Sequence, residues 1–314
     1  MLAIETQNLT MEYTLERGQK KKALQNLTLQ IPCGKVFGFL GHNGAGKTTT
    51  IKILMDLCRP TKGWARIYGI STEVPASRKS VGFLPEEPGF YDYLTALESL
   101  ESCCRLHGIP SKESKNLSQS AIQEVGLEGN GNRPVFTFSK GMKQRLAIAH
   151  AFAYDPDILI LDEPMSGLDP EGRRMLRDKM LSWKERGKTI FFTSHILSDV
   201  EHLCEEVAFL YQGKAIAMGK TRDFLKQQPI FVHISLHKEQ IAGIEFPFPL
   251  AIEPKEEKIA IILQEQDKIE KMKSFLQEKK IFPLAWIPEY ETLEECYFRL
   301  MKEKQDEDSC HCKE

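Results

Sequence analysis

The hydrophobic and polar positions of this chain change period along its length. Near the N-terminus apolar side chains recur at every second position, as Leu27, Leu29 and Ile31 do. This period of two predicts antiparallel strands over residues 1–31, each with one buried face. Farther on, short apolar runs alternate with segments of helical spacing, which indicates a largely parallel sheet covered on both faces. The predicted strands there are 36–40, 64–69, 81–84, 158–161, 189–193 and 207–211, and the predicted helices are 49–57 and 141–153.

A wholly helical pattern interrupts this alternation over residues 94–125. A stretch rich in Gly and Asn, residues 126–134, ends the interruption. We interpret the residues from about 90–135 as a helical insert within one large domain that spans residues 1–228.

The pattern changes again near residues 228 and 229, where a small α+β domain is predicted over 229–304. This domain has roughly the minimum size that can hold a core of its own. Its predicted strands are 230–236, 250–253, 258–263 and 282–287, and its predicted helices are 267–278 and 292–302. The polar residues 305–314 predict a disordered tail. That tail contains Cys310-His311-Cys312, which could bind a metal, but a fourth ligand and a scaffold are missing.

The composition narrows the classes of function. The chain has 314 residues, of which 41% are hydrophobic and 27% charged, and its net charge of −2 gives no reason to expect a nucleic-acid partner. No window approaches the ~18 consecutive apolar residues of a membrane span. Residues 1–5 lack the basic and apolar regions of a secretory signal, so none is expected. The eight cysteines are mostly scattered, which favours reduced thiols in a cytosolic setting.

The stretch from Gly41 to Thr48 matches G-x-x-x-x-G-K-[ST] between a predicted strand and a predicted helix. In that context the glycines let backbone N–H groups surround phosphate oxygens, and the helix N-terminus adds the positive end of its dipole. Lys47 can reach the β- and γ-phosphates, and the Thr48 hydroxyl can bind Mg²⁺. The motif therefore predicts binding of a nucleoside triphosphate. The residues expected to bind it are Gly41, Asn43, Gly44, Gly46, Lys47, Thr48 and Thr49.

Two carboxylates and a histidine follow other predicted strands. Asp162 and Glu163 end the apolar run 158–161, and His195 comes shortly after the strand 189–193. Ligands of α/β sheets bind at the carboxyl ends of the strands. We expect Asp162 to hold Mg²⁺ and Glu163 to accept a proton from the water that attacks the γ-phosphate. His195 would donate a hydrogen bond to that phosphate, so the three residues predict a hydrolytic site.

In this order the motifs resemble those of the nucleotide-binding subunit of an ATP-binding cassette (ABC) transporter, over about residues 2–228. Residues 138–145 occupy the place of the family's signature sequence, and residues 166–169 match the loop that crosses the dimer interface. His195 matches the switch histidine, and Tyr13 stands where the family stacks an aromatic ring on adenine. The implied fold is α/β: a P-loop ATPase core with an antiparallel β subdomain and a helical insert, plus a small C-terminal α+β domain.

The chain departs from the family's pattern in two places. The usual signature has a glycine and a glutamine where this chain has Lys140 and Met142. Ser139 and Gly141 remain, and they supply a hydroxyl and a close backbone N–H. Glu86 stands where the family normally has a glutamine, and a carboxylate can still bind Mg²⁺. This form of the signature resembles the exporter branch, whose ATPase and membrane subunits are separate chains.

The resemblance implies ATP and Mg²⁺ as ligands and a head-to-tail homodimer, or a pair with another cassette subunit, that sandwiches two ATP molecules. Each ATP would contact the phosphate loop of one subunit and Ser139 and Gly141 of the other. Closure of the dimer would drive export through an integral membrane permease, which would hold the chain at the inner face of the cell membrane. Coupling would run through the Glu86 loop and the helical insert. The transported substrate would be chosen by the membrane subunit.

Three other functions compete with transport. A soluble ABC-type ATPase that acts on DNA or ribosomes usually carries a coiled-coil insertion or a second cassette, and residues 60–314 contain no second phosphate-loop motif. A small-molecule kinase would leave Ser139 and His195 without a role. A module that holds ATP without turnover would lack Glu163 or Asp162. We therefore expect an ATP-hydrolysing transport subunit, with the soluble ATPase as the alternative.

Overall fold

The computed structural model describes residues 1–14, 18–225, 231–241, 243–250, 252–255 and 258–311. The chain forms two compact units, residues 1–221 with 300–314 and residues 222–299. The division between the units falls slightly before the predicted boundary at residues 228 and 229, which itself lies outside the described residues.

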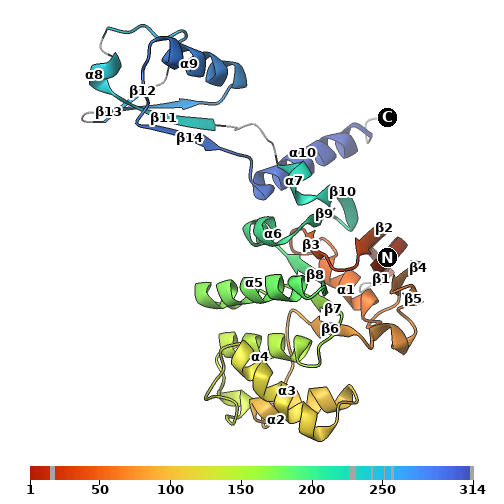
Figure 1. The fold of residues 1–314 in the computed structure, drawn as a ribbon. Helices are drawn as coiled ribbons and strands as arrows, with labels where there is room; N and C mark the ends of the chain where they lie inside the picture. Colours follow the sequence, from red (N-terminus) through yellow and green to blue (C-terminus); the bar gives the residue numbers. More distant parts are fainter. Residues whose placement is uncertain (15–17, 226–230, 242, 251, 256–257, 312–314) are drawn as a thin grey trace. The chain divides into compact units, whose positions relative to one another are not determined.

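An antiparallel sheet of the first unit has the strand order β2-β1-β4-β5 (Figure 1). β1 and β2 pair with Ile4 opposite Ile31 and Tyr13 opposite Lys21. Ile4, Leu29 and Ile31 are fully buried, which confirms the period of two predicted for the N-terminal strands. The strands are β1 (Leu2–Thr14), β2 (Lys20–Pro32), β4 (Lys62–Ile67) and β5 (Ile70–Ser71).

A six-stranded sheet forms the centre of the first unit, in the order β10-β9-β3-β8-β7-β6. The strands from β9 to β6 run parallel, and β10 pairs with β9 in the antiparallel sense. Every residue of β3, β7 and β8 is buried, as expected for central strands with continuous apolar sequences. The strands are β3 (Val36–Leu40), β6 (Val81–Leu84), β7 (Ile158–Leu161), β8 (Thr189–Ser194), β9 (Glu206–Tyr211) and β10 (Lys214–Lys220).

The helices of the first unit include α2 and α3 between β6 and β7, which confirms the predicted helical insert. α2 begins at a capping box in which Thr95 and Glu98 each accept a hydrogen bond from the other's backbone N–H. α1 ends at Leu54, earlier than predicted, and Asp56 follows it with a φ of 57°. α5 was not predicted from the apolar pattern and is capped by the Asp169 side chain. The helices are α1 (Lys47–Leu54), α2 (Ala96–Leu106), α3 (Ser111–Glu124), α4 (Lys140–Phe152), α5 (Pro170–Glu185) and α6 (Leu197–Leu203), with short 3₁₀ turns at Pro75–Arg78 and Val135–Thr137. α7 (Thr221–Phe224) begins at the last residue before the division between the units.

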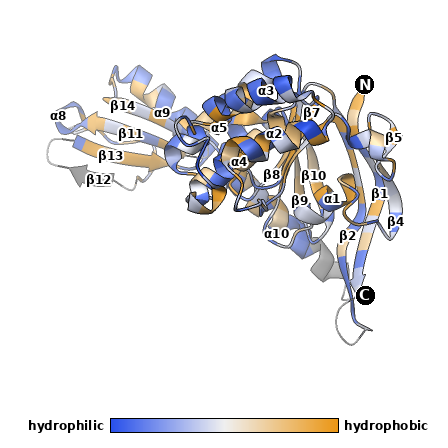
Figure 2. Ribbon diagram, turned by 90° about the horizontal axis from the view of Figure 1, so that it is seen from below, coloured by the Kyte–Doolittle hydropathy of each residue, from blue (hydrophilic) through white to orange (hydrophobic). Residues whose placement is uncertain are grey.

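The second unit is an antiparallel sheet, in the order β12-β13-β11-β14, with helix α9, and it confirms the predicted α+β pattern. Figure 2 shows hydrophobic residues along β11 and β13. Among them, Val232, Ile234 and Ile261 are almost fully buried. Met272 of α9 joins the same core. The elements are β11 (Phe231–His237), α8 (Lys238–Ile241), β12 (Ile252–Lys255), β13 (Lys258–Leu263), α9 (Gln266–Glu278) and β14 (Ala285–Glu289).

Helix α10 (Leu293–His311) continues into the segment predicted to be a disordered tail, so residues 305–311 are helical. The strong helix formers Lys302, Glu303, Lys304 and Gln305 lead into this segment, so the helix continues there although the segment itself is polar. Gln305 Nε2 donates a hydrogen bond to Tyr211 Oη of the first unit at 2.9 Å. The last cysteine of the predicted cluster falls in residues 312–314, outside the described residues. No helix within the described ranges is long and apolar enough to cross a membrane.

His150 on α4 lies where the helical insert packs against this helix. Its Nε2 is 3.0 Å from Ser99 Oγ of α2, and its ring meets that of Phe90 edge-on, with the centroids 5.5 Å apart. Desolvation lowers the pKa of His150 from 6.5 to about 4. The packing therefore favours the neutral imidazole.

We expect the free energy of unfolding to fall by about 1–2 kcal/mol as the pH drops from 6.5 to 4. The unfolded chain takes up the His150 proton at a higher pH than the folded chain does, so protonation favours unfolding within this window. Urea unfolding above pH 6.5 and near pH 5 measures the effect. His150→Gln should flatten this dependence, and His202→Gln, at an exposed position of α6, should retain it. The same dependence in wild type and His150→Gln would contradict the assignment.

Candidate nucleotide-binding site

Four parallel strands of the central sheet end beside one another. Leu161 of β7 pairs with Leu84 of β6 and with Phe192 of β8, and Leu40 of β3 pairs with Ser194 of β8. The loops that follow these strands therefore leave the sheet at one edge, where α/β proteins bind ligands. The predicted catalytic and metal-binding side chains all follow these four strands.

The phosphate loop, residues 41–48, joins β3 to α1 in a conformation that requires glycine at Gly46. The φ angle there is 112°, and a Cβ atom would lie 2.6 Å from Ala23 O. Gly213 N, in the turn between β9 and β10, donates a hydrogen bond to Ala45 O at 2.8 Å and supports the loop from outside. α1 begins within the motif, so its N-terminal N–H groups face the loop's cavity.

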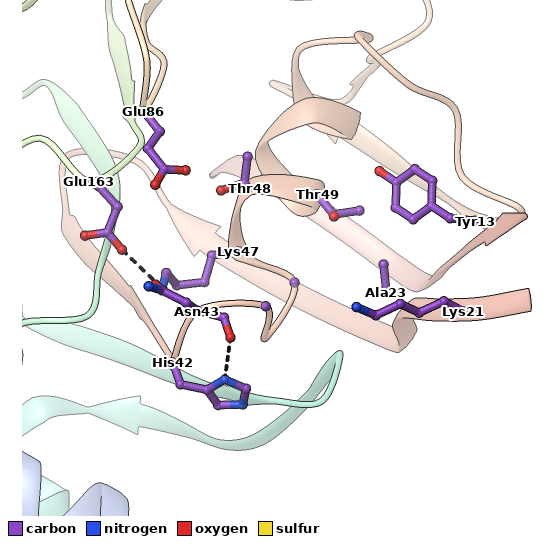
Figure 3. A pocket seen from close by; sticks show the side chains of 12 residues that line it. Tyr13, Lys21, Ala23, His42, Asn43, Lys47, Thr48, Thr49, Glu86 and Glu163 are labelled. Atoms are coloured by element: carbon purple, nitrogen blue, oxygen red, sulfur yellow. Dashed lines mark hydrogen bonds and ion pairs between the residues drawn. The ribbon is translucent and has the colours of Figure 1, made fainter. Parts of the chain in front are cut away.

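Lys47 and Glu163 form a buried ion pair at the start of α1 (Figure 3). Lys47 Nζ donates a hydrogen bond to Gly41 O at 2.6 Å and lies 3.1 Å from Glu163 Oε1. The two side chains are 6% and 9% exposed, so each charge depends on the other for compensation. Glu163 also has a φ of 48°, a left-handed conformation that costs a non-glycine residue about 1–3 kcal/mol and is typical of functional sites.

His195 extends this pair into a chain of three polar side chains. Its Nδ1 is 2.7 Å from Glu163 Oε2, and its backbone N–H donates to the same oxygen at 3.4 Å. Thr193 Oγ1 accepts a hydrogen bond from Glu163 N at 2.9 Å and so holds the carboxylate's backbone. The chain runs from the lysine of the phosphate loop to a half-exposed imidazole.

Asp162 is almost fully buried beside this chain, and Thr193 Oγ1 donates a hydrogen bond to its Oδ1 at 2.5 Å. Burial raises the pKa of Asp162, and the charges of Glu86 and Glu163 raise it further. Hydrogen bonds from the Thr193 and Thr48 side chains oppose that rise. Asp162 therefore lies in a desolvated environment within the electrostatic reach of two other carboxylates, Glu86 and Glu163.

These side chains fit a cation such as Mg²⁺. Asp162, Glu86 and Thr48 are hard oxygen donors. Glu163 Oε1 is buried without an aligned hydrogen bond, and its contact with the Lys47 ammonium is electrostatic only. A cation would stabilise the ionised Asp162, whose pKa is raised by burial and, less, by the charges of Glu86 and Glu163. In the described part of the chain no group of three or more His, Cys, Asp or Glu side chains could hold a metal by itself.

A cavity of about 390 Å³ opens at this edge of the sheet, a volume suited to a small-molecule ligand. Tyr13 of β1 lies at one end of the cavity, where desolvation raises the pKa of its hydroxyl. Gly41, Asp162 and His195 neighbour the cavity without lining it. The lining residues are Tyr13, Lys21, Ala23, His42, Asn43, Gly44, Gly46, Lys47, Thr48, Thr49, Glu86 and Glu163.

Three lining residues, Lys21, Ala23 and His42, were not predicted from the sequence. Lys21 pairs with Tyr13 across β1 and β2, and Ala23 shares its face two residues on, so strand register was the available signal. His42 occupies a variable position of the loop motif, and its ring meets that of Tyr211 edge-on, with centroids 5.5 Å apart.

The signature residues Ser139 and Gly141 do not line this cavity. Ser139 is exposed at the N-terminus of α4, where its Oγ accepts a hydrogen bond from Met142 N at 3.2 Å. Gly141 lies in the first turn, and a Cβ there would come within 3.4 Å of Gly167 O. One copy of the chain therefore does not bring the signature to its own phosphate loop.

Comparison with known proteins gives one consistent result. A family model described as "ABC transporter" matches residues 24–166. The chain is 42% identical over 209 residues to an uncharacterized ABC transporter ATP-binding protein of Synechocystis sp., a match that covers 66% of this chain and 59% of that relative. It is 35% identical over 243 residues to the bacitracin transport ATP-binding protein BcrA of Enterococcus faecalis, which covers 76% of each chain.

A solved ATP-binding cassette, in a dimeric post-hydrolysis state bound to ADP and Pi, has the same fold. Its TM-score is 0.65 at 26% identity, over 70% of this chain and 99% of that one. The chain spans less than two thirds of the length of the Synechocystis relative, at 59%, but more than two thirds of BcrA, at 76%. The family model and the similarity to BcrA agree with the geometry of the phosphate loop and of the sheet edge. The chain belongs to the ABC transporter family, among its ATP-binding proteins.

Proposed function

We propose that this chain binds ATP, hydrolyses it and drives export of a substrate through a separate membrane subunit. The observation that carries the proposal is the contact chain from Lys47 through Glu163 to His195 beside the phosphate loop. It joins a phosphate-binding cation to a carboxylate that can accept a proton. The similarity to a bacitracin transport protein supports export.

Hydrolysis would begin with a rearrangement of the buried ion pair. The γ-phosphate carries more negative charge than one carboxylate and would take Lys47 from Glu163. Glu163 would then accept a proton from water as the water oxygen bonds to the γ-phosphorus. The bond from that phosphorus to the bridging oxygen would break, and ADP would leave with the electron pair. His195, with both ring nitrogens protonated, would donate from Nδ1 to Glu163 and from Nε2 to the γ-phosphate.

We propose that Thr48, Asp162 and Glu86 hold Mg²⁺ together with the phosphates of ATP. The ion would neutralise charge on the phosphates as the γ-phosphoryl group is transferred. Glu86 replaces the usual glutamine, and its negative charge would strengthen the preference of this site for a cation. Burial is the main reason that the pKa of Asp162 is raised, and the charges of Glu86 and Glu163 add to it, so a bound cation would favour the ionised carboxylate.

Pairing of two copies, or of this chain with another cassette subunit, is part of the proposal. Ser139 and Gly141 lie outside the cavity at the N-terminus of α4, where backbone N–H groups attract phosphate. A partner's signature would complete each cavity, with the γ-phosphate as the bridge between the halves. Hydrolysis would remove the bridge and open the pair. The similarity to a dimeric cassette supports this arrangement.

We propose that the membrane subunit docks beside the Glu86 loop and the ends of the helical insert. Tyr91 and Tyr93 are 69% and 74% exposed, with ring centroids 5.9 Å apart. Phe136 is 65% exposed, and its N–H donates to Asp92 O at 3.1 Å, so both ends of the insert share this surface. Exposed aromatic side chains gathered in this way are typical of an interaction site. The partner would hold the chain at the inner face of the cell membrane.

Purification of the tagged protein in mild detergent should recover an integral membrane protein. Replacing Tyr91 and Tyr93 together by Ala should lower that recovery at least about fivefold, because aromatic anchors dominate interface energies. Phe282→Ala, at a 77% exposed aromatic of the C-terminal unit, serves as the control and should leave recovery unchanged. Recovery of ribosomes or nucleic acid alone would contradict transport and favour the alternative, a soluble ABC-type ATPase.

A further inference from the structure

Lys21 lines the nucleotide cavity from β2, directly opposite Tyr13 of β1. Figure 3 shows its side chain extending past Ala23 toward the phosphate loop. The sequence around it, with three consecutive lysines, suggests only a solvated hairpin. The register of the two strands instead puts the middle lysine on the face that carries Tyr13.

The two neighbouring lysines lie on the opposite face of the strand. Lys20 and Lys22 approach the Glu12 carboxylate, at 3.8 and 4.0 Å. Lys21, between them, forms no ion pair with any residue that the structure describes. The chain thus holds three lysines in one strand, of which one faces the cavity and two provide matched controls.

Among the described residues two lysines line the cavity, Lys47 and Lys21, and Lys47 is paired with Glu163, so Lys21 is the one whose charge can bind a further anion. Lys47 is held 3.1 Å from Glu163, and Glu86 adds a further carboxylate to the lining. A nucleotide with its β- and γ-phosphates in the glycine loop and its base toward Tyr13 would place its α-phosphate between these two ends, in the part of the cavity that Lys21 lines. An ammonium on a flexible stem binds phosphate as a point charge.

We propose that Lys21 binds the α-phosphate of the nucleotide and sets the affinity for AMP, ADP and ATP alike. The inference rests on the proposed nucleotide function and adds to it a contact from the antiparallel sheet. Lys21 belongs to β2 of the antiparallel sheet, and the phosphate loop follows β3 of the six-stranded sheet. A nucleotide bound to both would therefore connect the two sheets.

Titration calorimetry with wild type, Lys21→Ala, Lys21→Arg and Lys22→Ala tests this. Lys21→Ala should bind ADP and ATP about tenfold more weakly, which is the loss of about 1.4 kcal/mol from a charge-assisted contact. Lys21→Arg should restore most of the affinity, and Lys22→Ala should match wild type. The loss should persist with 2′,3′-dideoxy-ATP, because the contact is to phosphate.

Several outcomes would overturn the inference. If Lys21→Ala and Lys22→Ala bound ADP and ATP with equal affinity, the proposed contact between Lys21 and the α-phosphate would be refuted. Disappearance of the Lys21→Ala effect with 2′,3′-dideoxy-ATP assigns Lys21 to the ribose hydroxyls instead. A wild-type protein that binds neither ADP nor ATP refutes the proposed function itself, which separates that failure from a failure of the Lys21 contact.

Discussion

Glu163→Gln is expected to lower the rate of ATP hydrolysis by about 100- to 10,000-fold, the usual contribution of a general base. The amide keeps the shape of the side chain but cannot accept the proton of the attacking water. It also removes the negative charge that holds Lys47 at 3.1 Å, so the affinity for ATP should stay the same or rise. Steady-state phosphate release and equilibrium ATP binding measure the two effects. Undiminished turnover would contradict the role of Glu163.

The same variant reports on pairing of the subunits. With hydrolysis blocked, the γ-phosphate bridge should persist, and Glu163→Gln with Mg²⁺ and ATP should elute as a dimer in size-exclusion chromatography. Adding Ser139→Arg should return it to a monomer, because a large side chain would occupy the phosphate position at the exposed N-terminus of α4. Glu171→Gln, at an exposed position of α5, is the control and should retain wild-type turnover. An intact dimer after Ser139→Arg would refute the shared site.

Gly46→Ala should abolish nucleotide binding, with a loss of at least about 100-fold, and destabilise the fold by about 2–4 kcal/mol. The φ angle of 112° strains any residue with a Cβ atom. That atom would also lie 2.6 Å from Ala23 O and 2.7 Å from Leu24 Cδ2, so the phosphate loop would have to move away from β2. Calorimetric ATP binding and urea unfolding measure the two losses.

Gly44→Ala is the matched control for the stability loss. Its φ of 82° is also positive, but no atom lies within 4 Å of the added Cβ. We expect a cost of about 1 kcal/mol, from backbone strain alone. An equal stability loss at both glycines would show that the contact with β2 is unimportant and that positive φ accounts for the whole effect.

Local sequence patterns were sufficient to predict the features of this protein that depend on neighbouring residues. The phosphate loop, the apolar runs of β3 and β7 and the alternation along β2 are local patterns, because backbone conformation and side-chain period are local properties. Asp162, Glu163 and His195 could be assigned to one edge of the sheet because the carboxyl ends of parallel strands share an edge. The helical insert likewise followed from its period.

Which of those residues meet, and how deeply each is buried, became apparent only in the folded chain. The buried contact of Lys47 with Glu163 and the raised pKa of Asp162 come from desolvation between strands far apart in sequence. The direction of Lys21 depended on the register of β1 against β2, since a shift of one residue would send it to the other face. The helical conformation of the C-terminal part of α10 could not be predicted from composition, because polarity alone does not distinguish an exposed helix from a disordered tail.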